Sequence, residues 1–110
     1  MPDQPQAPAP TTPTGVLVLL TARQGVTREQ VMQVMPAEIR ATVQLHLEGK
    51  IRDWYGRADG RGAVFLLSTT DVAEARAIME ALPLAKAHLV DEDYIAVGPL
   101  FPLRLLLASA

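Results

Sequence analysis

The chain of 110 residues contains no cysteine, only two histidines and few aromatic side chains. Without cysteine it cannot form disulfides, iron–sulfur clusters, thiol nucleophiles or Cys-ligated zinc sites. The two histidines, His46 and His88, give little basis for a metal site, and their spacing to the acidic run 91–93 matches no known ligand pattern. We therefore expect neither a metal nor any other cofactor.

The sequence also lacks a basic excess and any long apolar run. Ten Lys and Arg oppose twelve Asp and Glu, a formal net charge of −2, which argues against nucleic acid as a partner. Apolar runs such as Val16–Leu20 are far shorter than the roughly 20 residues of a membrane-spanning helix. Asp3 is the only charge before that run, so we expect no secretory signal. These features predict a cytoplasmic protein without a membrane segment.

Proline is plentiful at one end of the chain, where residues 1–14 hold five of the nine prolines. Proline lacks a backbone donor and this stretch has little to bury, which predicts a disordered tail. At the other end, residues 99–110 include the apolar run Leu100–Leu107 with a single charge. We interpret them as an arm that lies on a neighbouring subunit or, alternatively, packs on the chain's own helices. A single domain over residues 15–98 lies between these ends.

The first half of this domain has the pattern of a strand followed by helices. The continuous apolar run 15–21 predicts a strand covered on both faces. Thr27 and Gln30 form a capping box that opens a helix. Because proline costs about 3 kcal/mol in a helix interior, Pro36 predicts a short helix over 28–34 and a second over 36–48. The second helix would carry one apolar stripe, made of Ile39, Val43, His46 and Leu47.

A hairpin, a helix and a last strand follow. Residues 51–57 and 63–68 predict two strands joined by a turn at Asp59-Gly60. Asp71 caps a helix that ends before Pro83; its buried stripe consists of Val72, Ala75, Met79 and Leu82. The last strand is expected over 93–97, because the acidic residues before it are poor strand formers.

This order of elements, βαββαβ, predicts a ferredoxin-like α+β fold with a four-stranded antiparallel sheet. Both helices of that fold cover the same sheet face. The runs 16–20 and 64–67 nevertheless place apolar side chains on both faces. An uncovered apolar face of this size marks an interface. We therefore expect a homodimer, or a larger homo-oligomer, that packs sheet on sheet as a dimeric α/β barrel and encloses a cavity.

The strand over residues 51–57 has two unlike faces. Simple alternation predicts one face made of Ile51, Asp53, Tyr55 and Arg57, and an opposite face made of Arg52, Trp54 and Gly56. If the first face lines the cavity, its carboxylate and phenol can move a proton and its guanidinium can bind an anion. Alternatively, these side chains form a solvated surface. Trp54 is expected to pack under the helices.

Three segments also resemble a known family: Leu47–Arg57, Gly62–Leu67 and Ala81–Leu84. Together they are similar to the muconolactone isomerase-like proteins over roughly residues 37–100. That resemblance implies a dimeric α/β barrel and a cofactor-free shift of a double bond in a small unsaturated acid or lactone, by acid–base groups in a pocket at the barrel mouth. Where the family carries histidine in its second strand, this chain has Asp53.

The isomerase hypothesis assigns roles to six side chains. Asp53 or His46 would be the base and Tyr55 the acid, while Arg57, Arg52 and His88 would bind the substrate. A lone histidine at the edge of a helix stripe is more often a packing residue than a base, which is the alternative for His46. The alternative function is a non-catalytic homo-oligomeric protein that binds a small molecule, or an accessory protein, on the same scaffold. The two hypotheses differ in whether ionisable groups lie inside an enclosed cavity.

Overall fold

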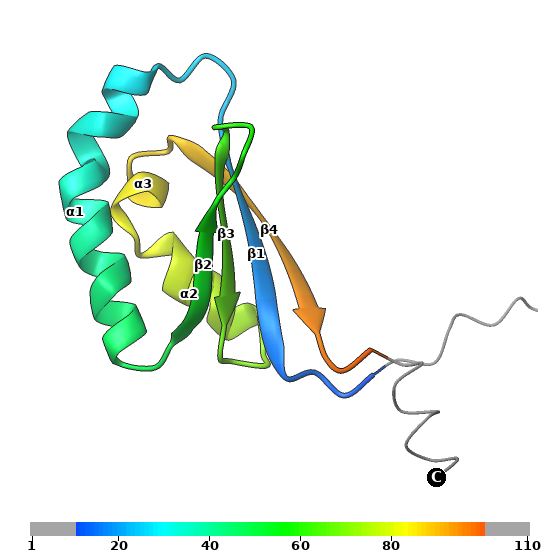
Figure 1. Cartoon of the computed structure of the whole chain (residues 1–110). Helices are drawn as coiled ribbons and strands as arrows, with labels where there is room; N and C mark the ends of the chain where they lie inside the picture. The colour runs from blue at the N-terminus through cyan, green and yellow to red at the C-terminus, as the bar shows by residue number, and fades with distance from the viewer. Residues whose placement is uncertain (1–10, 101–110) are drawn as a thin grey trace, which may run out of the picture.

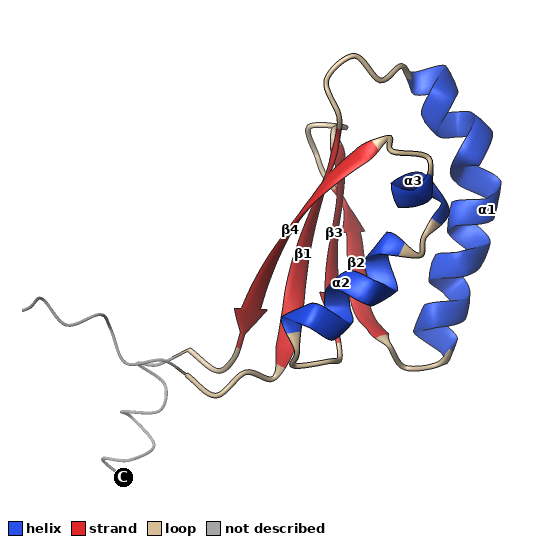
Figure 2. Ribbon diagram, turned by 180° about the vertical axis from the view of Figure 1, so that it is seen from behind, coloured by secondary structure: helices blue, strands red, loops and turns tan. Residues whose placement is uncertain are grey.

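Four strands form one sheet with all helices on one side, as a computed structural model describing residues 11–100 shows (Figures 1 and 2). The elements are β1 (Gly15–Ala22), α1 (Arg28–Leu47), β2 (Ile51–Gly56), β3 (Gly62–Leu67), α2 (Val72–Glu80), α3 (Pro83–Lys86) and β4 (Val90–Val97). The strand order is β2-β3-β1-β4, and all neighbouring strands are antiparallel. The predicted ferredoxin-like α+β fold is confirmed.

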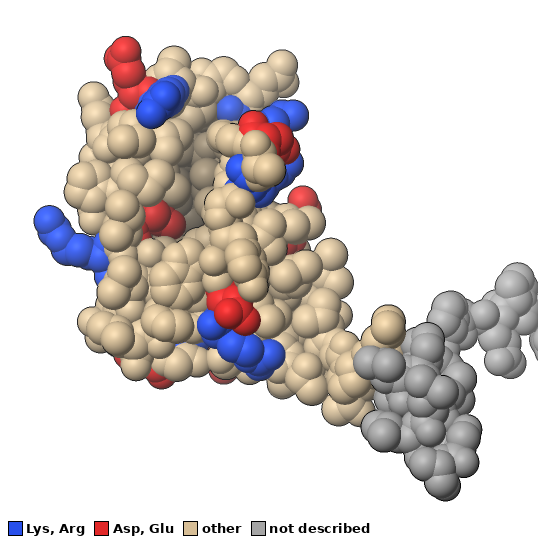
Figure 3. Space-filling view, in the orientation of Figure 1, with Lys and Arg blue, Asp and Glu red and all other residues tan. Residues whose placement is uncertain are grey.

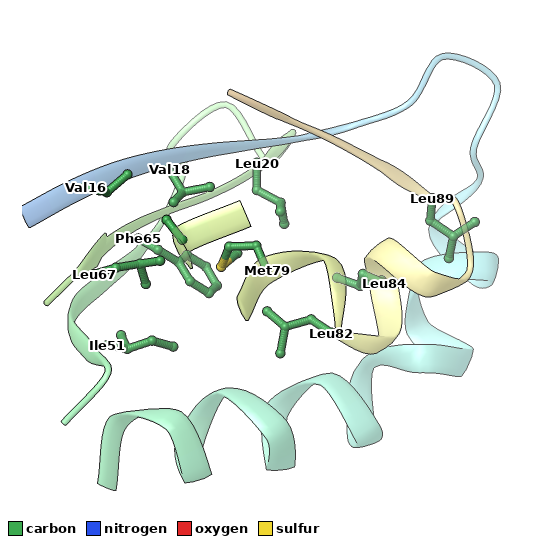
Figure 4. Packing of buried hydrophobic residues seen from close by; sticks show 11 residues of the cluster. Val16, Val18, Leu20, Ile51, Phe65, Leu67, Met79, Leu82, Leu84 and Leu89 are labelled. Carbon is green, nitrogen blue, oxygen red and sulfur yellow. The ribbon is translucent and has the colours of Figure 1, made fainter. Parts of the chain in front are cut away.

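The hydrophobic core lies between the helices and one face of the sheet (Figure 4). Every second residue of β1 points into it, and so do the residues of β3 that pair with them. The helices add the predicted stripe of α2 and Leu84 of α3, and Leu89 after α3 completes the core. The core residues are Val16, Val18, Leu20, Ile51, Phe65, Leu67, Ala75, Met79, Leu82, Leu84 and Leu89. The alternate residues of β1 and β3 are therefore left on the opposite face.

Helix α1 is continuous, so the predicted break at Pro36 is wrong. The capping box at Thr27 is present, with the Gln30 N–H donating to Thr27 Oγ1 and the Gln30 side chain accepting from the Thr27 N–H. Pro36 lies on the exposed side of the helix. There, water can hydrate the Met32 carbonyl that loses its helical donor, so the helix tolerates the proline.

The apolar stripe predicted for this helix faces solvent rather than the core. Leu47 is 74% exposed and Ile39 is 52% exposed. A second stripe packs inward instead, made of Val31, Val34, Met35, Glu38, Ala41, Thr42 and Leu45. Inward packing lets Glu38 accept the backbone N–H of Leu84 in α3, a donor that would otherwise be buried without a partner.

Two further boundaries differ from the prediction. Pro83 does not simply end a helix; it is the first residue of α3, a position where the missing N–H costs nothing. Strand β4 begins at Val90 rather than at Asp93. Its acidic residues are accommodated because Asp91 and Asp93 point away from the helices while the backbone pairs along β1. Backbone pairing thus overrides their low strand propensity.

Residues 11–14 and 97–100 run beside each other at one end of the sheet (Figure 1). The Thr14 N–H donates to the Val97 carbonyl at 2.8 Å, and Thr11 Oγ1 donates to the Pro99 carbonyl at 3.0 Å. Residues 1–10 and 101–110 lie outside the described residues, and with them most of the predicted tail and C-terminal arm.

Replacement of Pro36 by alanine is expected to stabilise the chain. The substitution restores one helical hydrogen bond and removes a ring that crowds the preceding turn, which predicts a gain of about 1–3 kcal/mol in the free energy of unfolding. Urea unfolding followed by circular dichroism measures it. Pro83→Ala is the matched control and should give no such gain, because a first-turn proline carries no penalty. An unchanged midpoint for Pro36→Ala would show that α1 is adapted to its proline.

Candidate functional site

The sheet face opposite the helices is apolar along its centre. Leu17 and Leu19 of β1 pair with Leu66 and Val64 of β3, and Leu17 also lies opposite Ile95 of β4. These five residues form what we call the apolar strip. Neighbouring side chains bury four of them in part, whereas Ile95 is 48% exposed. No helix of the described chain covers this face (Figure 2).

Three predicted site residues lie beside the apolar strip. Asp53 and Tyr55 pair with Leu66 and Val64, so both lie on the face without helices. Tyr55 is 60% exposed, and Asp53 is also exposed. Arg57 reaches the same face, because its Nη1 donates to Thr21 Oγ1 at 2.8 Å. The structure thus brings a carboxylate, a phenol and a guanidinium to one sheet face, as predicted.

The predicted grouping of Ile51 with Asp53 is wrong, because β2 contains a register shift between them. Ile51 pairs with Leu67 and is almost fully buried in the core. The extra residue of such a bulge, Arg52, leaves the regular alternation. Its Nη2 donates to the Thr14 carbonyl at 2.7 Å. Arg52 therefore ties β2 to the segment before β1.

Arg57 is held in place by partners of its own. Its Nη2 lies 2.6 Å from Asp59 Oδ2 in an ion pair, and Asp59 Oδ1 also accepts the Arg61 N–H. That backbone hydrogen bond and the Arg57 guanidinium lower the pKa of the exposed Asp59 carboxyl. A guanidinium has five N–H donors, so Arg57 keeps donors for an anion while its position at the β2–β3 turn is fixed.

Neither histidine joins these residues. His46 Nδ1 lies 3.0 Å from the Ile51 carbonyl, and its ring meets the Trp54 ring edge-on with centroids 4.5 Å apart. Trp54 lies on the predicted helix side of the sheet, but it is 39% exposed rather than packed under the helices. His46 is therefore on the opposite side of the sheet from Asp53. His88 follows α3 with a positive φ of 58° and precedes the other edge strand, β4.

A second site candidate, not foreseen from the sequence, lies on the helix side of the sheet. A pocket of about 720 Å³ opens between α1 and the β2–β3 turn, and Figure 3 shows it as a hollow with acidic atoms inside. Its wall includes Met35, Glu38 and Thr42 of α1, and its floor includes Trp54 and Phe65.

Glu38 is the notable residue of this pocket, with only 4% of its surface exposed. Its Oε1 accepts the Leu84 N–H at 2.9 Å. Burial raises the pKa of its carboxyl, an effect that this backbone hydrogen bond opposes only in part. The sequence carries a signal for it: Val31, Met35, Glu38, Thr42 and Leu45 follow one another at helical spacing, so a carboxylate interrupts an apolar stripe.

A second carboxyl with a raised pKa lies close to Glu38. Burial is the main cause for Glu92 of β4, and the nearby charges of Glu80 and Glu38 add to it. Glu92 Oε1 accepts from the Tyr94 hydroxyl at 3.1 Å, whereas its Oε2 is buried without a partner among the described residues. The Arg76 guanidinium lies 4.6 Å from the centre of the Tyr94 ring. Glu92 lines a smaller pocket that also includes His88.

Comparison with models of known protein families and with curated proteins gives no match for this chain. Within residues 11–100, no helix has the length and apolar character needed to cross a membrane. The same residues contain no group of three or more His, Asp or Glu side chains placed to hold a metal ion.

Replacement of Glu38 by glutamine is expected to stabilise the chain at neutral and higher pH. A carboxyl whose pKa is raised in the folded state stabilises the fold fully below pH 4.5, its usual pKa. That stabilisation is lost as the pH rises through the pKa of the folded state. Glutamine keeps an acceptor for the Leu84 N–H but cannot ionise. We expect Glu38→Gln to exceed wild type by about 1 kcal/mol at about pH 8 in urea unfolding, and by less at about pH 4. A less stable variant at the higher pH would contradict this.

Proposed function

We propose that the chain forms a homodimer through the sheet face without helices. The observation that carries this proposal is the apolar strip along β1, β3 and β4. Full burial of a Leu, Val or Ile side chain contributes up to about 1.5–3 kcal/mol, and part of that contribution is still missing for each of these five residues. A second copy with the same strip covers all of them at once.

We further propose that the dimer carries out cofactor-independent acid–base chemistry on a small unsaturated acid or lactone. Asp53 and Tyr55 lie at the border of the apolar strip, where a second sheet would remove water from them. In that setting a carboxylate can abstract a proton and a phenol can return one, which shifts a double bond. Arg57 binds the anionic end of the substrate. The resemblance to the muconolactone isomerase-like family supports this reaction class.

A non-catalytic role in binding small molecules is the second candidate function. It is favoured by the position of His46, the other predicted base, which lies across the sheet from Asp53 and Tyr55. A site with a single carboxylate and no second base can hold an anion at Arg57 without turning it over. The two functions share the dimer and differ only in turnover.

Leu66→Asp is expected to dissociate the proposed dimer. Leu66 points away from the helices, whereas its neighbour Leu67 is fully buried in the core. A carboxylate in the centre of the strip would be buried without a partner at a cost of several kcal/mol. Sedimentation velocity at micromolar concentration should therefore change from a dimer to a monomer of 11.9 kDa.

Val43→Asp is the control for this experiment, because Val43 is an exposed apolar residue of α1 on the opposite side of the molecule. It should leave the assembly unchanged. A wild-type chain that sediments as a monodisperse monomer would refute the dimer and the enclosed cavity together.

Asp53→Asn should abolish turnover if the chain is an isomerase. A panel of small unsaturated acids and lactones is incubated with the full chain, and the shift of the double bond is followed by ultraviolet absorbance. Loss of the proposed base is expected to lower kcat/KM by about 100-fold or more. Glu74→Gln, on the exposed side of α2, should leave the rate unchanged. Saturable binding of a panel member without turnover would select the non-catalytic function.

A further inference from the structure

The pocket between α1 and the sheet lies on the other side of the sheet from the apolar strip, and Tyr55 of the edge strand β2 is the one residue of the proposed dimer cavity that also lines it. We propose that this pocket binds a neutral, largely apolar small molecule that places a hydrogen-bond acceptor, such as a carbonyl, against Glu38. The site is contained within one protomer. The inference therefore does not rest on the proposed dimer or on its chemistry.

The size and lining of the pocket indicate the size of the ligand and its mainly apolar character. A volume of about 720 Å³ falls within the range of small-molecule sites, roughly 300–1,000 Å³. Most of its lining is aliphatic or aromatic, with Val31, Met32 and Met35 on one side and Leu20 and Phe65 on the other. Methionine side chains adapt to ligands of irregular shape, and the aromatic ring offers a flat surface.

Glu38 indicates the polar feature of the ligand. It is the only acidic residue among those that line the pocket. Its Oε1 is already engaged by the Leu84 N–H, which leaves Oε2 to interact with a bound molecule. A carboxyl that is 4% exposed in apolar surroundings favours its protonated form. The O–H of that form donates, so it selects an acceptor on the ligand.

The charged groups around Glu38 favour a neutral ligand. Burial is the main influence on the pKa of Glu38, and it opposes ionisation of this carboxyl. Arg28 and Arg61 line the mouth of the pocket and are exposed. Two cations at the entrance disfavour an ammonium ligand, while a protonated Glu38 offers no charge to attract one. An anionic ligand would have to leave water for an apolar pocket, and the polar group that it would meet there is the Glu38 carboxyl.

Trp54 provides a direct probe of this pocket. It is the only tryptophan of the chain and lines the pocket from β2. Its indole N–H therefore gives a single tryptophan side-chain signal in a proton–nitrogen correlation spectrum. Four compounds of similar shape serve as ligands: acetophenone (neutral acceptor), ethylbenzene (no acceptor), 1-phenylethylamine (cation) and benzoate (anion).

The test is a titration of each compound into the full chain at about pH 5, followed through the Trp54 signal. We expect a saturable shift with acetophenone and a dissociation constant about tenfold lower than that of ethylbenzene, the effect of one hydrogen bond. The amine and benzoate should bind more weakly still. The acetophenone affinity should fall as the pH rises and Glu38 ionises, because a carboxylate has no proton to donate.

Variants separate the contribution of Glu38 from that of the pocket. Glu38→Gln keeps an N–H donor and should bind acetophenone with no dependence on pH, whereas Glu38→Met should lose the tenfold preference over ethylbenzene. Glu92→Gln changes the other carboxyl with a raised pKa, which lies outside this pocket, and should retain the preference. Ala63→Leu narrows the floor of the pocket without touching Glu38 and should abolish the shift.

Several outcomes would overturn the proposal. Equal affinity for ethylbenzene and acetophenone in the wild type would show that Glu38 takes no part in binding. Tightest binding of the amine would show that the site takes a cation. An unaltered acetophenone shift in a folded Ala63→Leu variant would place the binding elsewhere, and absence of any saturable shift would remove the site altogether.

Discussion

A four-stranded sheet with its helices on one side cannot bury both of its faces within a single chain. In this protein the conflict is pronounced, because residues 16–20 of β1 and 63–67 of β3 are apolar at every position rather than at every second one. One set of alternate side chains makes the core with α2 and α3. The other set makes the apolar strip and requires a covering surface from elsewhere, since water is a poor environment for it. Both sites on the molecule follow from this division.

On the helix side, α1 does not close fully on the sheet. Its inward face carries Glu38 and Thr42 among apolar residues, and a buried carboxyl needs a donor rather than more hydrophobic contact. The Leu84 N–H supplies that donor and draws α1 toward α3. The pocket lies beside this hydrogen bond, because its lining includes both Glu38 and Leu84 as well as Gly60 and Arg61 of the β2–β3 turn.

Most of the fold could be predicted from local patterns, because caps, turns and alternation are properties of a few adjacent residues. In the structure, Thr27 and Asp71 cap the helices that follow them, and Gly60 has the positive φ of a turn residue, as their positions in the sequence indicate. The failures have non-local causes. The orientation of α1 depends on a hydrogen bond between Glu38 and Leu84, 46 residues apart, and the tolerance of Pro36 depends on its facing solvent. The placement of Asp53, Tyr55 and Arg57 on one face was predicted; the separation of His46 from them was not.

The bulge at Arg52 determines which surface each later residue of β2 serves. Beyond it, consecutive residues alternate between the two faces of the sheet: Trp54 pairs with Phe65 on the helix side, and Tyr55 pairs with Val64 on the opposite face. Arg52 is the extra residue of the bulge, so its loss would leave Ile51 paired with Leu67 and Asp53 with Leu66, and both sets would keep their faces. The loss of one residue after Asp53 would instead exchange the faces of the residues that follow. Point substitutions in this strand can change one site without the other. Insertions and deletions beyond Asp53 cannot, so evolution is free to tune each surface separately only while that part of the strand keeps its length.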